Sequence, residues 1–219
     1  MILFGTGDLA RLAAAHLADD SRHEVVAFTA DAAPEIGTDT FQGLPFVAFE
    51  RLAETFPPHG VEVFVAVGYR RVNRARAEVY RRVKEAGYRL LTYVSPHAIV
   101  APGVDLGDNC FVFEGAILQA AVRIGSDTIV RAGAVIGHDT SIGEHCFIAP
   151  RASISGSTVI GDYTFVGNNA TVRDRITVAP HTVIGAGALI AGDTRPGEIY
   201  VPERTRAAAG RTSSELDDL

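Results

Sequence analysis

The stretch AVIGHDTSIGEHCFIA, residues 134–149, decides the fold because a branched aliphatic residue returns at every sixth position. Ile136, Ile142 and Ile148 mark the spacing, and it extends through residues 100–195, which divide into 16 hexads that all begin with Val, Leu or Ile. The fifth residue of most hexads is small. A six-residue repeat of this length predicts a parallel β-helix, in which each hexad forms a short strand and a corner. An ordinary strand does not keep one register for so long.

Three hexads complete one coil of a triangular solenoid, so the 16 hexads predict about five coils. The aliphatic first residue points inward and stacks on its equivalent 18 residues away in the sequence. The small fifth residue fits beside the corner, where Gly, Asn and Asp tolerate the turn geometry. Cys110 and Cys146 both occupy the fifth position. We therefore predict that both cysteines are small core residues.

The residues ahead of the repeats alternate strand and helix signals instead. The predicted elements are, in order, a strand at 2–5, a helix within 5–20, a strand at 23–30, a turn into a helix at 46–56, a strand at 61–69, a helix at 71–87 and a strand at 88–95. This β-α-β order predicts a small parallel sheet with helices on both faces, a Rossmann-like α/β domain. We expect this domain at residues 1–96, an all-β solenoid at 97–197 and a polar C-terminal tail at 198–219.

Composition excludes several classes of protein. The formal net charge is −6 and the pI is about 5.6, whereas nucleic-acid-binding domains usually carry a basic face. Two cysteines are too few for a disulfide framework. No run of about 20 apolar residues predicts a membrane span. The start MILFGTGDLA has no charged segment of the signal-peptide kind, so a cytoplasmic protein is expected.

The segment GTGDLA, residues 5–10, forms a G-x-G-x-x-A loop between a predicted strand and a predicted helix. Such a loop lays phosphate groups against the N-terminus of the helix. Asp31 follows Gly7 by 24 residues, near the spacing of a ribose-binding acid. The motif alone is weakly specific, and a purely structural domain is the alternative. The candidate nucleotide-binding residues are Gly5, Thr6, Gly7, Asp8 and Asp31.

His138 occupies the third position of its hexad, outside the predicted core. Residues 18 positions apart stack, and the column through His138 reads Ala120, His138, Gly156, Asp174, Gly192. The small neighbours leave an open slot beside the imidazole. An imidazole, with an ordinary pKa of about 6.5, suits general-base catalysis near neutrality, and Asp139 would hold its competent tautomer. The alternative is an ordinary surface histidine at a corner.

His145 belongs to a different column, which reads Asp127, His145, Tyr163, His181. We interpret this column as a stacked row of rings at the surface or at a subunit contact. A zinc site of the carbonic-anhydrase type would need His138, His145 and His181 to converge. Because His138 lies in another column, no metal is expected.

The repeat resembles that of the left-handed β-helix acyltransferases. Together with the α/β domain, it resembles the sugar O- and N-acetyltransferases related to sialic acid O-acetyltransferase and bacillosamine N-acetyltransferase. Within that family a GYxxxNxxR segment occurs, here GYRRVNRAR at 68–76, and the catalytic histidine falls at the GHD of 137–139. The resemblance implies a homotrimer that binds acetyl-coenzyme A in clefts between neighbouring solenoids. It also implies backbone contacts to the coenzyme from Gly156, Asn168 and Ala186, and a nucleotide-sugar in the front domain.

The sequence departs from the family pattern at three places. Phe147 stands where bacillosamine-type relatives have a second active-site histidine, and Leu9 stands where relatives have a histidine in the G-x-x-G-H loop. The terminal turn is altered to YVPERTR at 200–206, where Arg204 and Arg206 are candidate phosphate contacts or solvated side chains.

The sequence therefore predicts acetyl-coenzyme A-dependent acetyl transfer to an amino or hydroxyl group of a sugar, which is nucleotide-linked in this hypothesis. Attack would be direct, because no Ser or Cys adjoins His138 as a nucleophile. A non-enzymatic scaffold and the zinc enzyme are the alternatives. The sequence leaves open whether nitrogen or oxygen is acylated, which sugar is used, and how large the acyl group is.

Overall fold

The structure is a computed structural model that describes residues 1–20, 22–31 and 39–203. Its front domain contains a sheet with strand order β3-β4-β2-β1-β5-β6. Every neighbouring pair is parallel except β3 and β4, which are antiparallel. The strands are β1 (Ile2–Phe4), β2 (Ala27–Ala30), β3 (Thr40–Phe41), β4 (Leu44–Ala48), β5 (Glu62–Val65) and β6 (Arg89–Leu90).

Helices cover both faces of this sheet, as predicted. The helical segments are α1 (Asp8–Asp19), η1 (Phe49–Arg51), α2 (Leu52–Thr55), η2 (Pro58–Gly60) and α3 (Arg74–Glu85). Leu9, Ala13 and Leu17 of α1 pack on one face, whereas α2 and α3 pack on the other. Helix α3 ends just before Gly87, whose φ of +86° suits glycine after a helix.

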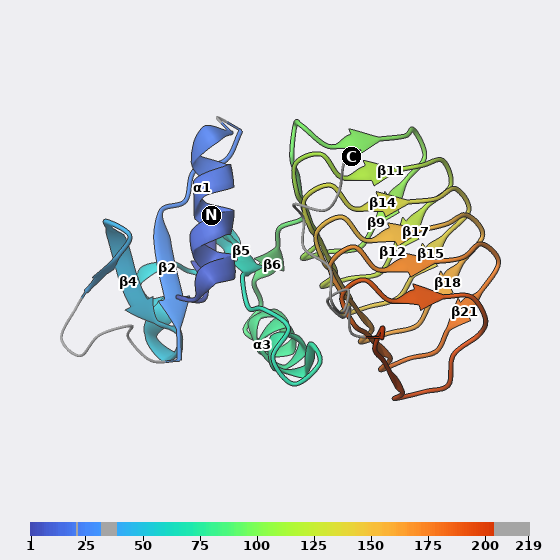
Figure 1. Cartoon of the computed structure of the whole chain (residues 1–219). Helices are drawn as coiled ribbons and strands as arrows, with labels where there is room; N and C mark the ends of the chain where they lie inside the picture. The colour runs from blue at the N-terminus through green and yellow to red at the C-terminus, as the bar shows by residue number, and fades with distance from the viewer. Residues whose placement is uncertain (21, 32–38, 204–219) are drawn as a thin grey trace, which may run out of the picture.

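The hexads form a parallel β-helix with three faces (Figure 1). The first face contains β7 (Tyr93–Val94), β10 (Phe111–Val112), β13 (Ile129–Val130), β16 (Phe147–Ile148), β19 (Phe165–Val166), β22 (Val183–Ile184) and β24 (Ile199–Tyr200). The second contains β8 (Ile99–Val100), β11 (Ile117–Leu118), β14 (Val135–Ile136), β17 (Ser153–Ile154), β20 (Thr171–Val172) and β23 (Leu189–Ile190). The third contains β9 (Asp105–Leu106), β12 (Arg123–Ile124), β15 (Ser141–Ile142), β18 (Val159–Ile160) and β21 (Thr177–Val178).

The solenoid core follows the predicted repeat. Strands 18 residues apart pair in register, so that Ile136 aligns with Leu118 and Ile154, and these aliphatic residues fill one continuous core. Cys110 and Cys146 are buried and free, as predicted. The fourth residue of nearly every hexad has positive φ, which makes the corners. We name the corners by the faces they join: first corner (first to second), second corner (second to third) and third corner (third to first).

The segment 88–95, predicted as one strand of the front sheet, divides between the two domains. Strand β6 ends the front sheet, and β7 already belongs to the first face of the solenoid. The solenoid therefore begins before the expected boundary at Pro96, because Tyr93 pairs with Phe111 in the β-helix register. At the other end, β24 extends the first face beyond residue 197. Residues 204–219 of the predicted tail, including Arg204 and Arg206, lie outside the described residues.

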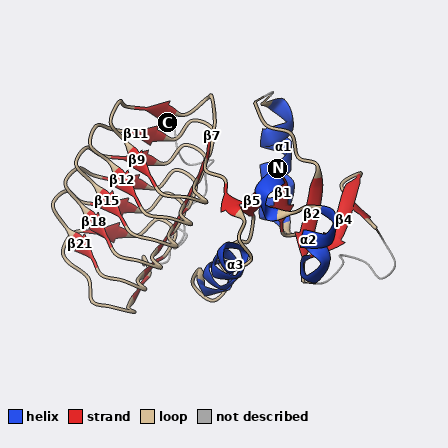
Figure 2. Ribbon diagram, turned by 180° about the vertical axis from the view of Figure 1, so that it is seen from behind, coloured by secondary structure: helices blue, strands red, loops and turns tan. Residues whose placement is uncertain are grey.

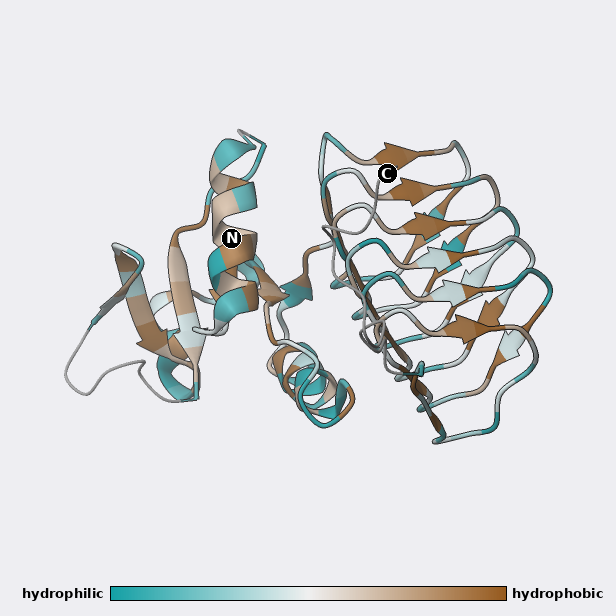
Figure 3. Cartoon of the chain, viewed as in Figure 1, coloured by the Kyte–Doolittle hydropathy of each residue, from teal (hydrophilic) through white to brown (hydrophobic). Residues whose placement is uncertain are grey.

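The front domain lies against the first face (Figures 1 and 2). Outward-facing Phe111, Ile129 and Phe147 of this face join the cluster that also contains α1 and the front sheet. Hydrophobic residues, drawn in brown, occur along this side of the solenoid and on several strands of the second face (Figure 3). In the described part of the chain, no helix is both long and apolar enough to cross a lipid bilayer.

Candidate active site

The predicted base, His138, lies at the second corner, after β14. Its side chain is 60% exposed, and Nδ1 lies 2.8 Å from Oδ2 of Asp139. The backbone N–H of His138 donates to Oε1 of Gln119 at 2.9 Å. A carboxylate on Nδ1 selects the tautomer with its proton on that nitrogen. This leaves the lone pair of Nε2 free to accept a proton.

Gly156 makes room for the imidazole. A Cβ at this position would fall 2.7 Å from Nε2 of His138 and 2.9 Å from its Cε1. Any side chain at 156 would therefore displace the ring. The structure thus brings His138, Asp139 and Gly156 together.

The other predicted coenzyme contacts lie elsewhere on the solenoid. Asn168 and Ala186 are exposed at the first corner, between the first and second faces. The two residues are neighbours in one column along the solenoid axis, and the amide of Gly187 donates to the carbonyl of Asn168 at 2.8 Å. Gly156 lies on the second corner, across the second face. A single chain therefore does not bring the three predicted positions into one compact site.

The GTGD loop lines a cavity of about 580 Å³ between the front domain and the first face. Its front-domain residues are Gly5, Thr6, Gly7, Asp8, Leu9, Leu12, Ala66, Val67, Gly68, Tyr69 and Arg70, and its solenoid residues are Arg131 and Phe147. Gly5 has φ +133°, and a Cβ there would lie 2.8 Å from the carbonyl oxygen of Ala66. Beside Gly7, the N-cap of α1, a Cβ would meet nothing within 4 Å. The loop thus presents open backbone to the cavity, as a phosphate site requires.

Asp31 does not share this cavity with Gly7 and Asp8. It lines a neighbouring hollow that also contains Gly5 and Thr6, and both of its carboxylate oxygens accept hydrogen bonds from Arg82, at 2.6 and 3.0 Å. This guanidinium lowers the pKa of Asp31. Asp8 is 95% exposed and faces Arg11 at 3.4 Å. Sequence spacing could not reveal that an arginine of α3 already engages the predicted ribose-binding acid.

The cavity and His138 lie on opposite sides of the solenoid. The solenoid residues of the cavity belong to the first face or directly follow it, whereas His138 lies on the corner that joins the other two faces. In a triangular cross-section that corner is opposite the first face. A chain alone therefore holds the candidate base and the candidate acceptor cavity apart.

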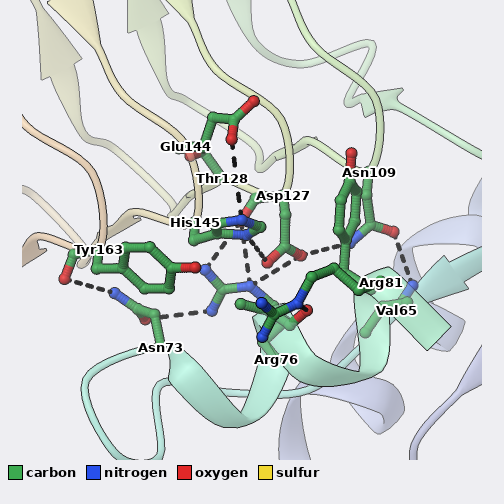
Figure 4. A network of polar contacts seen from close by, with 12 residues as sticks. Val65, Asn73, Arg76, Arg81, Asn109, Asp127, Thr128, Glu144, His145 and Tyr163 are labelled. Atoms are coloured by element: carbon green, nitrogen blue, oxygen red, sulfur yellow. Dashed lines mark hydrogen bonds and ion pairs between the residues drawn. The ribbon is translucent and has the colours of Figure 1, made fainter. Parts of the chain in front are cut away.

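The GYxxxNxxR segment joins the two domains (Figure 4). Arg76 of α3 is fully buried, and its guanidinium donates to the Asp127 carboxylate at 3.1 Å and to the backbone oxygens of Asp127 and Cys146. The side-chain amide of Asn73 donates to the carbonyl of Thr164 at 3.2 Å. The Asp127 carboxylate also accepts from Asn109 at 2.7 Å. The asparagine and arginine of the motif are therefore docking residues, while Gly68 and Tyr69 line the cavity.

The predicted row of rings is present, but its first member is buried. His145 lies 4.7 Å from Tyr163, and Tyr163 lies 4.8 Å from His181, between ring centroids. Nδ1 of His145 lies 2.8 Å from the Asp127 carboxylate beneath α3, and only 7% of its side chain is exposed. The prediction of stacking is confirmed, whereas the prediction of a surface position is wrong for His145. The sequence spacing predicts which residues share the column, but it does not predict that α3 packs upon it.

Other chemistries have little support in the described residues. Within 1–20, 22–31 and 39–203, no three His, Cys, Asp or Glu side chains are grouped so that they could hold a metal ion. Burial raises the pKa of the Cys110 and Cys146 thiols to about 12. A thiolate nucleophile is therefore disfavoured at either position.

Comparison with known proteins agrees with this fold. The model of the bacterial transferase hexapeptide family (six repeats) matches residues 121–156 and 157–192. A variant of perosamine N-acetyltransferase from Caulobacter crescentus, solved with CoA and GDP-perosamine, is 28% identical, with a TM-score of 0.80 and 90% of each chain covered. The acetyltransferase domain of PglB from Neisseria gonorrhoeae, solved with acetyl coenzyme A, is 27% identical, with a TM-score of 0.80 and 90% of this chain and 93% of that chain covered.

WeeI from Acinetobacter baumannii, 18% identical with a TM-score of 0.81 over 90% of this chain and 94% of that one, shares the fold. The search of curated proteins finds no match. The solved N-acetyltransferase structures cover 90% of the chain, the front domain included. The chain is therefore similar to acetyltransferases of the left-handed β-helix class: its repeats match the hexapeptide transferase model, and its fold is that of solved sugar N-acetyltransferases.

Proposed function

We propose that the chain transfers an acetyl group from acetyl-coenzyme A to a nucleotide-linked sugar, with His138 as the general base. The observation that carries this proposal is the exposed imidazole, held on Nδ1 by Asp139 at 2.8 Å and set against the bare backbone of Gly156. An amino group is the favoured acceptor, because the similar solved structures include N-acetyltransferases, one with CoA and GDP-perosamine. A hydroxyl acceptor is the alternative.

The proposed chemistry is direct transfer. The sugar amine attacks the thioester carbonyl while Nε2 of His138 removes its proton, and Asp139 stabilises the imidazolium that forms. Collapse of the tetrahedral intermediate breaks the carbon–sulfur bond. The departing thiolate then takes the proton from His138, which restores the neutral base. A general base of this kind contributes about 10²–10⁴ in rate.

The front domain is the proposed acceptor site. The open backbone at Gly7, the N-terminus of α1 and the 580 Å³ cavity support binding of a phosphate-bearing ligand there. In this proposal Gly5, Thr6, Gly7 and Asp8 hold the diphosphate. To contact the ribose, Asp31 would have to release the Arg82 guanidinium that it now binds. Of the proposed acceptor-site residues, Asp31 therefore has the least support.

A homotrimer would allow His138 and the acceptor cavity, which lie apart in one chain, to form one site from two chains. Among the described residues, the second face presents Ile99, Ile117, Val135 and Leu189 outward, and Ile99 and Leu189 are more than 60% exposed. Neighbouring copies packed around these apolar faces would bring His138 of one chain toward the cavity of the next. Gly156 and the first-corner positions Asn168 and Ala186 would then flank acetyl-coenzyme A between two solenoids.

Release of coenzyme A thiol tests the function. Wild-type protein is supplied with acetyl-coenzyme A and a panel of nucleotide-linked amino sugars, and His138→Ala is compared with it. We expect thiol release with at least one acceptor and a loss of about 10²–10⁴ in kcat for the variant. Turnover close to wild type in His138→Ala would exclude this base. Failure of the wild-type protein to bind coenzyme A in calorimetry would favour a non-enzymatic scaffold instead.

A further inference from the structure

Arg131 is the cationic residue that the solenoid contributes to the acceptor cavity. It directly follows β13, at the first corner, and its guanidinium carbon lies 4.4 Å from the ring centroid of Phe113. Stacking on an aromatic face fixes the plane of a guanidinium and leaves its N–H edge directed outward. The same residue lines the cavity across from the GTGD loop. The front domain and the solenoid therefore face each other over a space of about 580 Å³.

The charge of Arg131 is incompletely compensated. Its Nε is buried without a hydrogen-bond partner, and among the residues that the structure describes it forms no ion pair. Burial lowers the pKa of the Arg131 guanidinium, although Glu114 and Tyr69 oppose this effect. Glu114 Oε2 lies 3.1 Å from Nε2 of His16, but it too is buried without a hydrogen-bond partner. A half-buried guanidinium without a counter-ion is costly, and an anionic ligand in the cavity would offset its charge.

The remaining walls define which anion fits. Gly7 and Gly68 leave open space, since a Cβ at either position would meet nothing within 4 Å. Tyr69 packs edge to face against Phe147 at a centroid distance of 5.0 Å and is 55% exposed. The cavity thus combines bare backbone, the side chains of Arg70 and Arg131, the single carboxylate of Asp8 and an aromatic wall. A phosphate attached to a ring-bearing group matches these features better than a free, uncharged sugar does.

We propose that Arg131 binds the phosphate of the acceptor from the solenoid side, opposite the GTGD loop, and so selects nucleotide-linked over free sugars. This inference rests on the proposed acceptor site. Guanidinium groups bind phosphate oxygens through paired hydrogen bonds that a lysine does not reproduce. The acceptor would then bridge the two domains, and its position relative to the solenoid would be set by a residue of the solenoid itself.

Calorimetric titration with UDP, GDP and CDP tests Arg131. Arg131→Met keeps a side chain that packs on Phe113 but removes the charge, and Arg131→Lys keeps the charge without the paired donors. Arg123→Met is the matched control, because Arg123 is an exposed arginine on the third face, away from the cavity. We expect the nucleotide that binds wild type to bind Arg131→Met about 10- to 100-fold more weakly, Arg131→Lys at an intermediate level, and Arg123→Met unchanged.

The outcomes separate the two proposals. Affinity for the nucleotide that is equal in wild type and both Arg131 variants would overturn the role of Arg131 and leave the acceptor site standing. If Arg131→Met does not fold, wild-type affinity in Arg131→Lys overturns that role by itself. If wild type binds acetyl-coenzyme A but none of the nucleotides, the acceptor site fails and the inference fails with it. Equal loss in Arg123→Met would indicate a general effect of net charge, which would also contradict the proposal.

Discussion

Replacing Gly156 with alanine should disable the candidate base while leaving the fold intact. The added Cβ would lie 2.7 Å from Nε2 of His138, whereas ordinary contacts of a Cβ begin near 3.4 Å. The imidazole must therefore move by about 0.7 Å, and it has room to do so because its side chain is 60% exposed. A misplacement of about 1 Å in a reacting group can cost about 10² in rate. We expect kcat to fall about 10- to 100-fold while the melting temperature changes little.

Steady-state thiol release measures this change, and Gly192→Ala is its matched control. Gly192 lies in the same column, but a Cβ there would meet nothing within 4 Å. The control should therefore retain wild-type kcat. Circular dichroism and thermal unfolding establish that both variants fold. A Gly156→Ala enzyme with unchanged kcat would refute the reasoning, because the imidazole would then be displaced without consequence for the reaction.

Three further predictions concern the cavity, the docking network and the cysteines. Gly7→Val should fold, since open space adjoins Gly7. It should raise the KM for the acceptor and leave coenzyme A affinity unchanged, and an unchanged KM and kcat would exclude the front domain as a nucleotide site. Arg76→Met should lower the free energy of unfolding by about 3–5 kcal/mol in denaturant titration, because the buried Asp127 carboxylate would lose its guanidinium partner. Arg89→Met, at an ion pair whose arginine is 82% exposed, should cost at most about 1 kcal/mol. Iodoacetamide should leave native Cys110 and Cys146 unmodified and activity intact, because both are buried; modification under native conditions, detected by mass spectrometry, would contradict that.

The solenoid could be predicted from sequence because its contacts repeat. Each hexad pairs with its equivalent one coil away, so the spacing of Ile136, Ile142 and Ile148 contains the strand register, the core and the corners. The same logic placed Gly156 beside His138 and stacked Tyr163 between His145 and His181. Column neighbours within the solenoid thus follow from arithmetic alone.

Contacts between the domains could not be predicted in this way. Arg76 reaches Asp127 of the solenoid from a helix 51 residues earlier in the chain. Within the front domain, Arg82 engages Asp31 across the same separation, which was equally unpredictable. No periodic pattern relates these positions. The signal that could have identified the docking residues is the pair of polar side chains, Asn73 and Arg76, at the start of a helix that must pack against a largely apolar wall. Burial of an arginine at such a wall requires a partner, and Asp127, at a corner of the solenoid, is that partner.

Mixed assemblies of two impaired variants give the sharpest test of a shared active site. If each site combines His138 of one chain with the cavity of a neighbour, His138→Ala retains an intact cavity and Gly7→Val retains an intact base. Equal amounts of the two chains, unfolded and refolded together, assemble at random into symmetric oligomers. About one quarter of the sites would then join a base-proficient chain to a cavity-proficient neighbour, since each condition is met with a probability of about one half. Thiol release measured below the acceptor KM should recover to about one quarter of the wild-type rate, whereas each variant refolded alone stays far below that rate. A site built within one chain predicts no recovery, because every chain in the mixture carries a defect; that result, with light scattering showing mixed oligomers, would overturn the intersubunit site.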